Sequence, residues 1–380
     1  MSSQQRNDQR GVVSLFIVIF TALLITVVTI SFVQLMLHDQ QQASTSDLSQ
    51  SAYDSAQAGV EDAKRALLLE QNCDQNGQVV AGVDCAKVRA ALASNSCDSV
   101  STALNMPQPN NETLIQQDEA DKNLDQAYTC VKVSVNTPDY VGTLQTNDSQ
   151  VIPLSGTSSF DRIEINWFTS SDSPSRTMSY PAIISLPKSN GSVWKGNTPA
   201  LMRSQLIQVG GRFTQSNLDT ASGANSDVNT LFLYPSSIGS NTKNFADDDR
   251  RSGLAAPQII RCQPNFVTAT YACSATITLP SPIDGSANNR TAFLRLSAIY
   301  NKSTFQIKLK NGATDVPFSG AQSEVDSTGR ANDLFRRVKS RVTLGGGFPY
   351  PQAAVDITGN LCKNFSITDD PADYVSSCTP

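Results

Sequence analysis

The sequence predicts an α+β protein in which one long N-terminal helix, transmembrane and then amphipathic, leads into an antiparallel β-rich head stapled by disulfide bonds. An uncharged apolar run covers residues 12–37, and no proline occurs before Pro107. Beyond that point, runs of alternating polar and apolar residues recur between polar segments rich in glycine and proline, as is typical of antiparallel strands. All eight cysteines follow the apolar run.

The apolar run is long enough to cross a membrane, because a transmembrane helix needs about 20 predominantly apolar residues. Arg6 and Arg10 precede the run, and positive charge on that side predicts that the N-terminus stays in the cytoplasm. A secretory signal has a shorter apolar region with a small-residue cleavage site behind it, whereas His38 follows this run directly. The run is therefore predicted to be an anchor and not a removable export signal.

The helix is predicted to continue over residues 38–70 as an amphipathic segment. Small or aliphatic residues recur three or four apart, which places them on one helix face; they are Leu48, Ala52, Ala56, Val60, Ala63 and Leu67. Gly59 is the weak point, since glycine costs about 1 kcal/mol against alanine inside a helix. The alternative is two helices joined near residues 40–42.

Residues 71–136 form a predicted cysteine-bearing connecting region, with a helix over residues 86–93 and a strand over residues 128–135. The β-rich head follows over residues 137–344. Its further predicted strands cover residues 162–168, 200–209, 258–261, 269–279, 291–300, 304–310 and 334–344. An irregular tail over residues 345–380 completes the chain.

Disulfides are the expected role of the cysteines, since an even number behind a membrane anchor fits an oxidising compartment. Short loops favour pairing between sequential neighbours, namely Cys73 with Cys85, Cys97 with Cys130, Cys262 with Cys273, and Cys362 with Cys378. Eight cysteines allow many other connectivities. Metal binding is the alternative, but no C-x2-C pair occurs.

The net charge does not favour nucleic-acid binding, and the sequence lacks the histidine motifs of common catalytic sites. A formal net charge of −5 gives no electrostatic footprint for DNA or RNA. His38 is the only histidine and borders the apolar run, so neither a Ser-His-Asp triad nor an H-E-x-x-H metal site is expected. We therefore expect a protein that is not an enzyme and holds no cofactor.

The N-terminal region resembles that of type IV pilin-like proteins, which carry a short leader ending in glycine, an apolar segment and one continuous helix feeding a β-rich head. The glycine here is Gly11. Within that superfamily the likeness is to PilX-type minor pilins, through QRGVVSL at residues 9–15 and the small-residue stretch AQAGVEDA at residues 56–63. The likeness extends over residues 9–70.

This resemblance implies that residues 1–11 are a leader removed by a prepilin peptidase after Gly11, leaving Val12 as the mature N-terminus. It implies a single-pass subunit of the cytoplasmic membrane, with its N-terminus inside. The inner-membrane assembly machinery would then move it from the lipid into an extracellular filament, where its N-terminal helix packs against other pilin subunits.

One departure from the family pattern narrows the expected role. Major pilins carry a glutamate at the fifth mature position, where it pairs with a neighbouring N-terminal ammonium, and a buried carboxylate needs such a partner. Phe16 stands at that position here. The resemblance therefore implies a minor subunit, at the tip or at initiation. The alternative function is a signal-anchored extracellular adhesin that forms no fibres, and the ligand of the head, such as a host surface or DNA, is left open.

Overall fold

The computed structural model describes residues 9–76, 82–115, 125–180, 194–210, 228–247, 257–266, 270–284 and 290–343. The chain forms two compact units. The first comprises the described residues up to Lys132 together with Val325–Ser340, and the second comprises Val133–Glu324 with the described residues from Arg341 onward. This division differs from the contiguous one expected from the sequence, because a late segment of the chain returns to the first unit.

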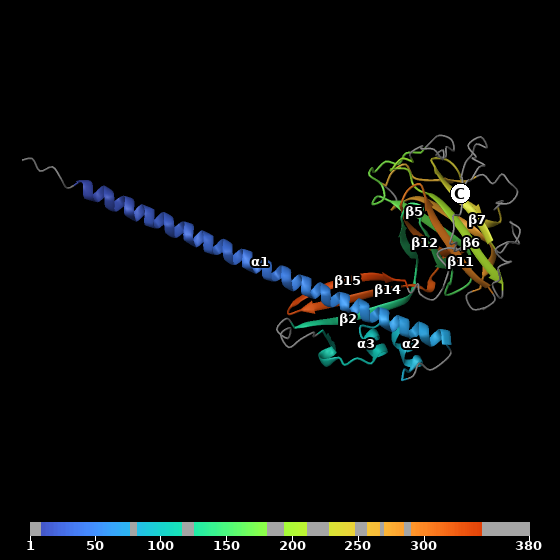
Figure 1. Ribbon diagram of the computed structural model, residues 1–380, viewed down its shortest axis with the longest axis horizontal. Helices are drawn as coiled ribbons and strands as arrows, with labels where there is room; N and C mark the ends of the chain where they lie inside the picture. Colours follow the sequence, from blue (N-terminus) through green and yellow to red (C-terminus); the bar gives the residue numbers. More distant parts are fainter. Residues whose placement is uncertain are drawn as a thin grey trace, which may run out of the picture. The chain divides into compact units, whose positions relative to one another are not determined.

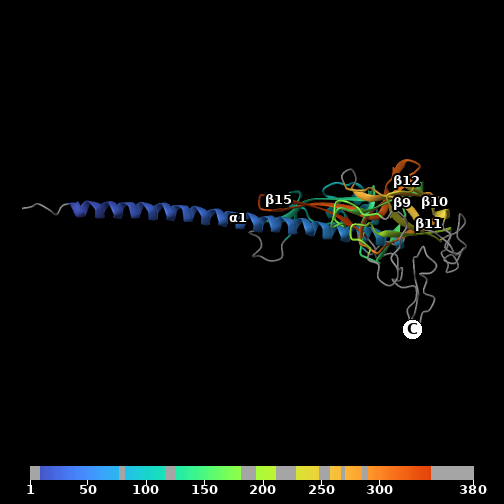
Figure 2. The ribbon, with the colours of Figure 1, turned by 90° about the horizontal axis from the view of Figure 1, so that it is seen from above.

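The first unit is built on α1, a single helix over Gln9–Asn76 (Figure 1). The helix passes through residues 40–42 without interruption, so it agrees with the single helix predicted and not with two joined helices (Figure 2). Its length follows from the absence of proline and from good helix formers along residues 52–70.

A four-stranded sheet packs on the second half of α1. Its strand order is β1-β2-β14-β15. The strands cover Thr113–Leu114 (β1), Gln126–Thr137 (β2), Phe318–Ala331 (β14) and Leu334–Val342 (β15). Asn332 begins the two-residue connection between β14 and β15, with a φ of 49°. Asparagine tolerates this left-handed conformation, which tight hairpin turns require.

The helix and the sheet approach each other closely because small residues face one another. Ala52 and Ala56 of α1 have no exposed surface. A Cβ atom added to Gly329 of β14 would overlap the backbone nitrogen of Ala56 and the backbone oxygen of Ala52. A Cβ atom added to Gly59 of α1 would overlap the Ser327 hydroxyl. Gly59 therefore allows the sheet to approach, and packing offsets its low helix propensity.

Among the described residues, the first unit also contains two short α-helices, a 3-10 turn at Pro109–Asn111 and two disulfides. The helices are α2 over Cys85–Ala93, as predicted, and α3 over Ser99–Leu104, which the sequence analysis did not predict. Asp84 caps α2 by accepting hydrogen bonds from the backbone of Ala86 and Lys87. The Cys73–Cys85 disulfide ties the end of α1 to the start of α2.

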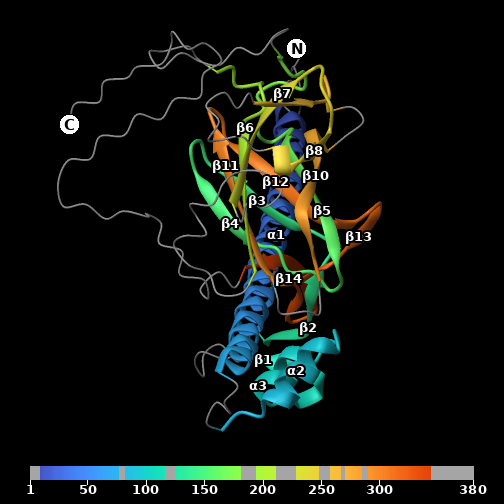
Figure 3. The same cartoon turned by 90° about the vertical axis from the view of Figure 1, so that its right-hand side faces the viewer.

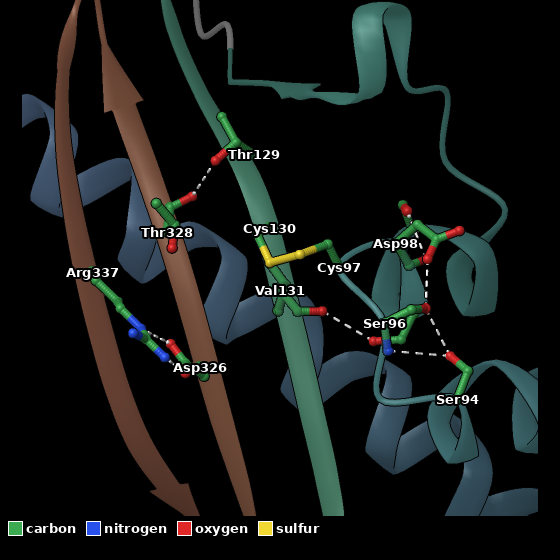
Figure 4. The surroundings of a disulfide bond; sticks show 12 residues. Ser94, Ser96, Cys97, Asp98, Thr129, Cys130, Val131, Asp326, Thr328 and Arg337 are labelled. Atoms are coloured by element: carbon green, nitrogen blue, oxygen red, sulfur yellow. Dashed lines mark hydrogen bonds and ion pairs between the residues drawn. A yellow bond between two sulfur atoms is a disulfide. The ribbon is translucent and has the colours of Figure 1, made fainter.

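The second disulfide, Cys97–Cys130, joins the segment before α3 to strand β2 (Figure 4). The backbone nitrogen of Val131 donates a hydrogen bond to the Cys97 carbonyl at 3.0 Å. Beside β2 in the same sheet, Arg337 of β15 forms an ion pair with Asp326 of β14. The covalent link and these polar contacts hold the sheet and the short helices in one unit.

The second unit is a sandwich of two sheets. One sheet has the order β13-β12-β5-β10-β8, with β3 also paired to β12, and the other has the order β4-β11-β6-β7-β9. In Figure 3, β4, β11 and β6 lie on one side of this unit and β5 and β10 on the other. The pairing is mostly antiparallel as predicted, but β8 pairs with β10 and β7 with β9 in parallel.

Six strands of the second unit, β5, β6, β9, β10, β11 and β12, correspond to predicted ones, whereas β3, β4, β7, β8 and β13 were not predicted. The bounds are Tyr140–Leu144 (β3), Ser149–Pro153 (β4), Phe160–Thr169 (β5), Leu201–Gly210 (β6), Val228–Ser236 (β7), Thr242–Asn244 (β8), Gln258–Arg261 (β9), Tyr271–Ile283 (β10), Arg290–Ile299 (β11), Ser303–Asn311 (β12) and Thr314–Val316 (β13). Side chains from both sheets meet in one apolar core around the fully buried Trp167. The Cys262–Cys273 disulfide joins the residue after β9 to β10.

We predict that Gly329→Ala lowers the free energy of unfolding by about 3 kcal/mol, because the new methyl group must displace helix backbone. The matched control is Gly196→Ala, where the nearest atom to an added Cβ is Pro174 Cγ at 3.6 Å. Urea denaturation in detergent micelles, followed by circular dichroism, measures the free energy of unfolding of both variants. Equal stability of the two variants would contradict the close approach of β14 to α1.

Candidate functional site: the exposed apolar half of the long helix

The most prominent surface of the first unit is the apolar first half of α1, which extends clear of the sheet that covers the second half (Figures 1 and 2). Large apolar side chains between Leu15 and Leu37 are exposed on every side of the helix, from 49% for Val33 to 75% for Phe16. A helix that is apolar all round is stable when lipid or other apolar helices surround it. Among the described residues, this is the one helix long and apolar enough to span a membrane.

The hydroxyl groups between Leu15 and Leu37 are satisfied by the helix itself. The hydroxyl groups of Thr21, Thr26, Thr29 and Ser31 donate to backbone oxygens one turn earlier, at 2.7 to 3.0 Å. Each hydroxyl thus reaches an acceptor without water, which a hydrocarbon environment requires. The stretch can therefore enter an apolar environment without leaving these hydrogen-bond donors unpaired.

A polar segment separates the two halves of α1. The side chains of residues 38–47 are all exposed and include His38, Asp39 and three consecutive glutamines. Beyond them the buried stripe begins at Ala52 and runs through Ala63 to Leu67. One helix thus carries three successive surfaces: apolar all round, polar all round, and amphipathic.

The predicted processing and register residues lie at the start of this helix. Gly11 and Val12 are in its first turns, because α1 begins at Gln9. Phe16 is the most exposed of the large apolar side chains in the described part of the chain. Its ring therefore faces the surroundings of the helix, where a neighbouring helix or lipid would contact it.

The structure brings together three of the four predicted cysteine pairs: Cys73–Cys85, Cys97–Cys130 and Cys262–Cys273. Cys362 and Cys378, together with the predicted tail, lie outside the described residues. Within the described ranges, no group of three or more His, Cys, Asp or Glu side chains is arranged to hold a metal ion.

Sequence reasoning missed one charged cluster in the first unit. Arg330 of β14 forms ion pairs with Glu112 at 2.6 Å and with Asp125 at 2.7 Å, although both partners lie more than two hundred positions earlier. The hydrogen bond from Arg330 lowers the pKa of the Asp125 carboxyl below its ordinary value. This cluster joins the segments on both sides of β1 to the sheet that holds α1.

Comparisons of the chain with models of known protein families, with curated proteins and with solved structures return no match.

We predict that Arg330→Gln lowers the free energy of unfolding by about 2 kcal/mol at neutral pH, because the variant loses hydrogen bonds between charged groups. A carboxyl group whose pKa is lowered in the folded state stabilises the protein at pH values above its ordinary pKa, which is 3.8 for Asp125. This stabilisation is lost as the pH falls through the lowered pKa of the folded state. The difference between wild type and variant should therefore be larger at pH 7 than at pH 3.

Urea denaturation at the two pH values checks this prediction, with Arg176→Gln as the control at an exposed arginine of the second unit. A difference between wild type and Arg330→Gln that stays the same at pH 3 would show that the carboxylates do not act through Arg330.

Proposed function

We propose that the protein is a structural subunit of an extracellular type IV pilus-like filament, processed by a prepilin peptidase after Gly11. The observation that carries this proposal is the division of α1. One uninterrupted helix has a second half docked on a sheet and a first half whose apolar surface is exposed all round. Such a helix can sit in lipid as a monomer and exchange lipid for neighbouring helices on assembly.

The proposed partners follow from this surface. Membrane lipid surrounds residues 15–37 before assembly, and the corresponding helices of other pilin subunits surround them in the fibre. The prepilin peptidase and the inner-membrane assembly machinery act on the chain in between. The subunit moves from the cytoplasmic membrane, N-terminus inside, to the cell surface, and its role is structural and not catalytic.

Phe16 supports a minor position in the filament. An aromatic side chain cannot accept a hydrogen bond from, or neutralise, the terminal ammonium of an adjacent subunit inside an apolar fibre core. A buried ammonium without such a partner is costly. A subunit that offers no carboxylate at this position is best placed at the tip or at initiation. The alternative, an anchored adhesin that forms no fibres, shares the membrane helix but not the assembly step.

We predict that Gly11→Ala leaves the chain uncut, because the peptidase would meet a side chain at the position before the cleaved bond. Mass spectrometry of protein from sheared filaments should give a mature chain that begins at Val12 for wild type. Ser3→Ala, a change elsewhere in the leader, should be cut normally.

A filament-borne chain that still begins at Met1 would contradict the processing step. Immunogold labelling confined to the cell body, with a correctly cut chain, would favour the anchored adhesin over the filament subunit.

A further inference from the structure

The second unit carries a polar groove on the outer face of its larger sheet. The hollow has a volume of about 520 Å³ and is floored by strands β3, β12, β5 and β10. A second hollow of about 550 Å³ shares Asn241, Arg261 and Gln263 with the first, so the two form one groove. The core lies on the opposite face of this sheet, where Trp167 and its neighbours are buried.

The strand register sets polar side chains in one row across the floor. Asn166 of β5 pairs with Gln306 of β12 on one side and with Ser274 of β10 on the other. Because side chains alternate along a strand, these residues point away from the core, while Ile165 and Ile307 point into it. The row therefore presents two amides and a hydroxyl to the groove.

Hydrogen bonds fix the two amides in place. The Asn166 amide nitrogen donates to Gln306 Oε1 at 3.1 Å and to Glu164 Oε1 at 2.8 Å. The Gln306 amide nitrogen donates to Asp139 Oδ2 at 2.5 Å, and Arg341 donates to Asp139 Oδ1 at 3.0 Å. A ligand thus meets a floor whose polar groups are already oriented, which lowers the entropy cost of binding.

The rim of the groove is held by the Cys262–Cys273 disulfide and by the hydrogen bonds beside it. The backbone nitrogen of Gln263 donates to the Ala272 carbonyl, and the backbone nitrogen of Cys262 donates to the Ser236 carbonyl, each at 2.7 Å. These links keep the exposed Gln263 side chain next to the half-buried ring of Tyr271.

The chemistry of the groove selects the class of ligand. The lining carries one carboxylate, Asp139, and one cation, Arg261, and this single positive charge is too little to hold a nucleic-acid backbone. The floor is polar, whereas pockets for lipids and drug-like molecules are mostly apolar. Planar amides, a carboxylate and one aromatic ring match the hydroxyl groups and apolar ring face of a sugar.

We propose that this groove binds a neutral saccharide, with Asn166, Gln306 and Gln263 contacting sugar hydroxyl groups and Tyr271 contacting a ring face. The saccharide site goes beyond the filament role and does not depend on it, because every residue of the groove lies in the second unit. A failure of leader processing would leave this proposal intact, and a failure of saccharide binding would leave the filament proposal intact.

The test is binding of the full chain, in detergent micelles, to an array of immobilised neutral, sialylated and sulfated oligosaccharides, followed by titration with the neutral oligosaccharide bound most strongly. We expect binding to neutral members of the array. Gln263→Ala and Tyr271→Ala should each weaken the affinity at least tenfold. The control Thr278→Ala, on the same sheet face but outside the groove lining, should bind as wild type.

Gln263→Ala removes an exposed side chain and keeps the backbone bond at this position, so loss of binding in this variant cannot be attributed to unfolding. The proposal is overturned if the array binds no neutral oligosaccharide, or if it binds only sialylated or sulfated ones. It is also overturned if Gln263→Ala and Tyr271→Ala both bind as tightly as Thr278→Ala.

Discussion

The close approach of α1 to β14 is the contact on which the first unit depends. Gly329 brings the strand against the helix backbone at Ala52 and Ala56, and Gly59 makes room for Ser327 one turn further along. A larger side chain at Gly329 would meet helix backbone and push the two elements apart, whereas one at Gly59 would first displace the side chains of Ser327 and Val131. Because β1, β2 and β15 are joined to β14 in one sheet, this contact sets the position of the sheet on the helix.

Docking by small residues leaves α1 with two unlike halves. The second half buries its stripe against the chain's own sheet, so it needs no outside partner. The first half buries none of its large apolar side chains within the described chain, from Leu15 to Leu37. Exposed apolar surface costs roughly 25 cal/mol per Å² in water, so contact with lipid or with other apolar helices would stabilise this half. The second half of α1 is fixed to the sheet of the first unit, and the first half is the surface through which the proposed subunit would contact lipid or other helices.

Much of this arrangement could be predicted from local sequence signals. The length of α1 followed from the absence of proline, and the sequence pattern also predicted the helix over residues 86–93 and the longer strands other than β7 and β14. Three cysteine pairs followed from short loops. Strand β14 could not be predicted, because the residues that let α1 come close, Ser327 and Gly329, are poor strand formers that favour a loop. Strand β7 was missed because it lies between two polar segments. Strands β1, β3, β4, β8 and β13 were also missed, because each has only two to five residues and shows little alternation.

The ion-pair cluster around Arg330 and the polar row of the groove could not be predicted from the sequence, for a different reason. Arg330 meets Glu112 and Asp125 only after the β14–β15 hairpin returns to the first unit. The row of Asn166, Gln306 and Ser274 exists only once β5, β10 and β12 are aligned in register. Pairings between distant segments depend on the topology of the sheets, and single-sequence patterns carry no information about it.

The most direct test of the two-part helix is a cysteine scan along α1 with a water-soluble maleimide, on the full chain in membranes. Labelling of the unsubstituted chain is subtracted. We expect no cysteine within residues 18–35 to react and every cysteine within residues 39–47 to react. Beyond residue 47, reactivity should vary with a helical period. In that last part Ala52, Ala56 and Ala63 should be protected, and Tyr53 and Gln57 should react. Helical periodicity within residues 18–35, or equal reaction at Ala56 and Gln57, would contradict the two-part helix.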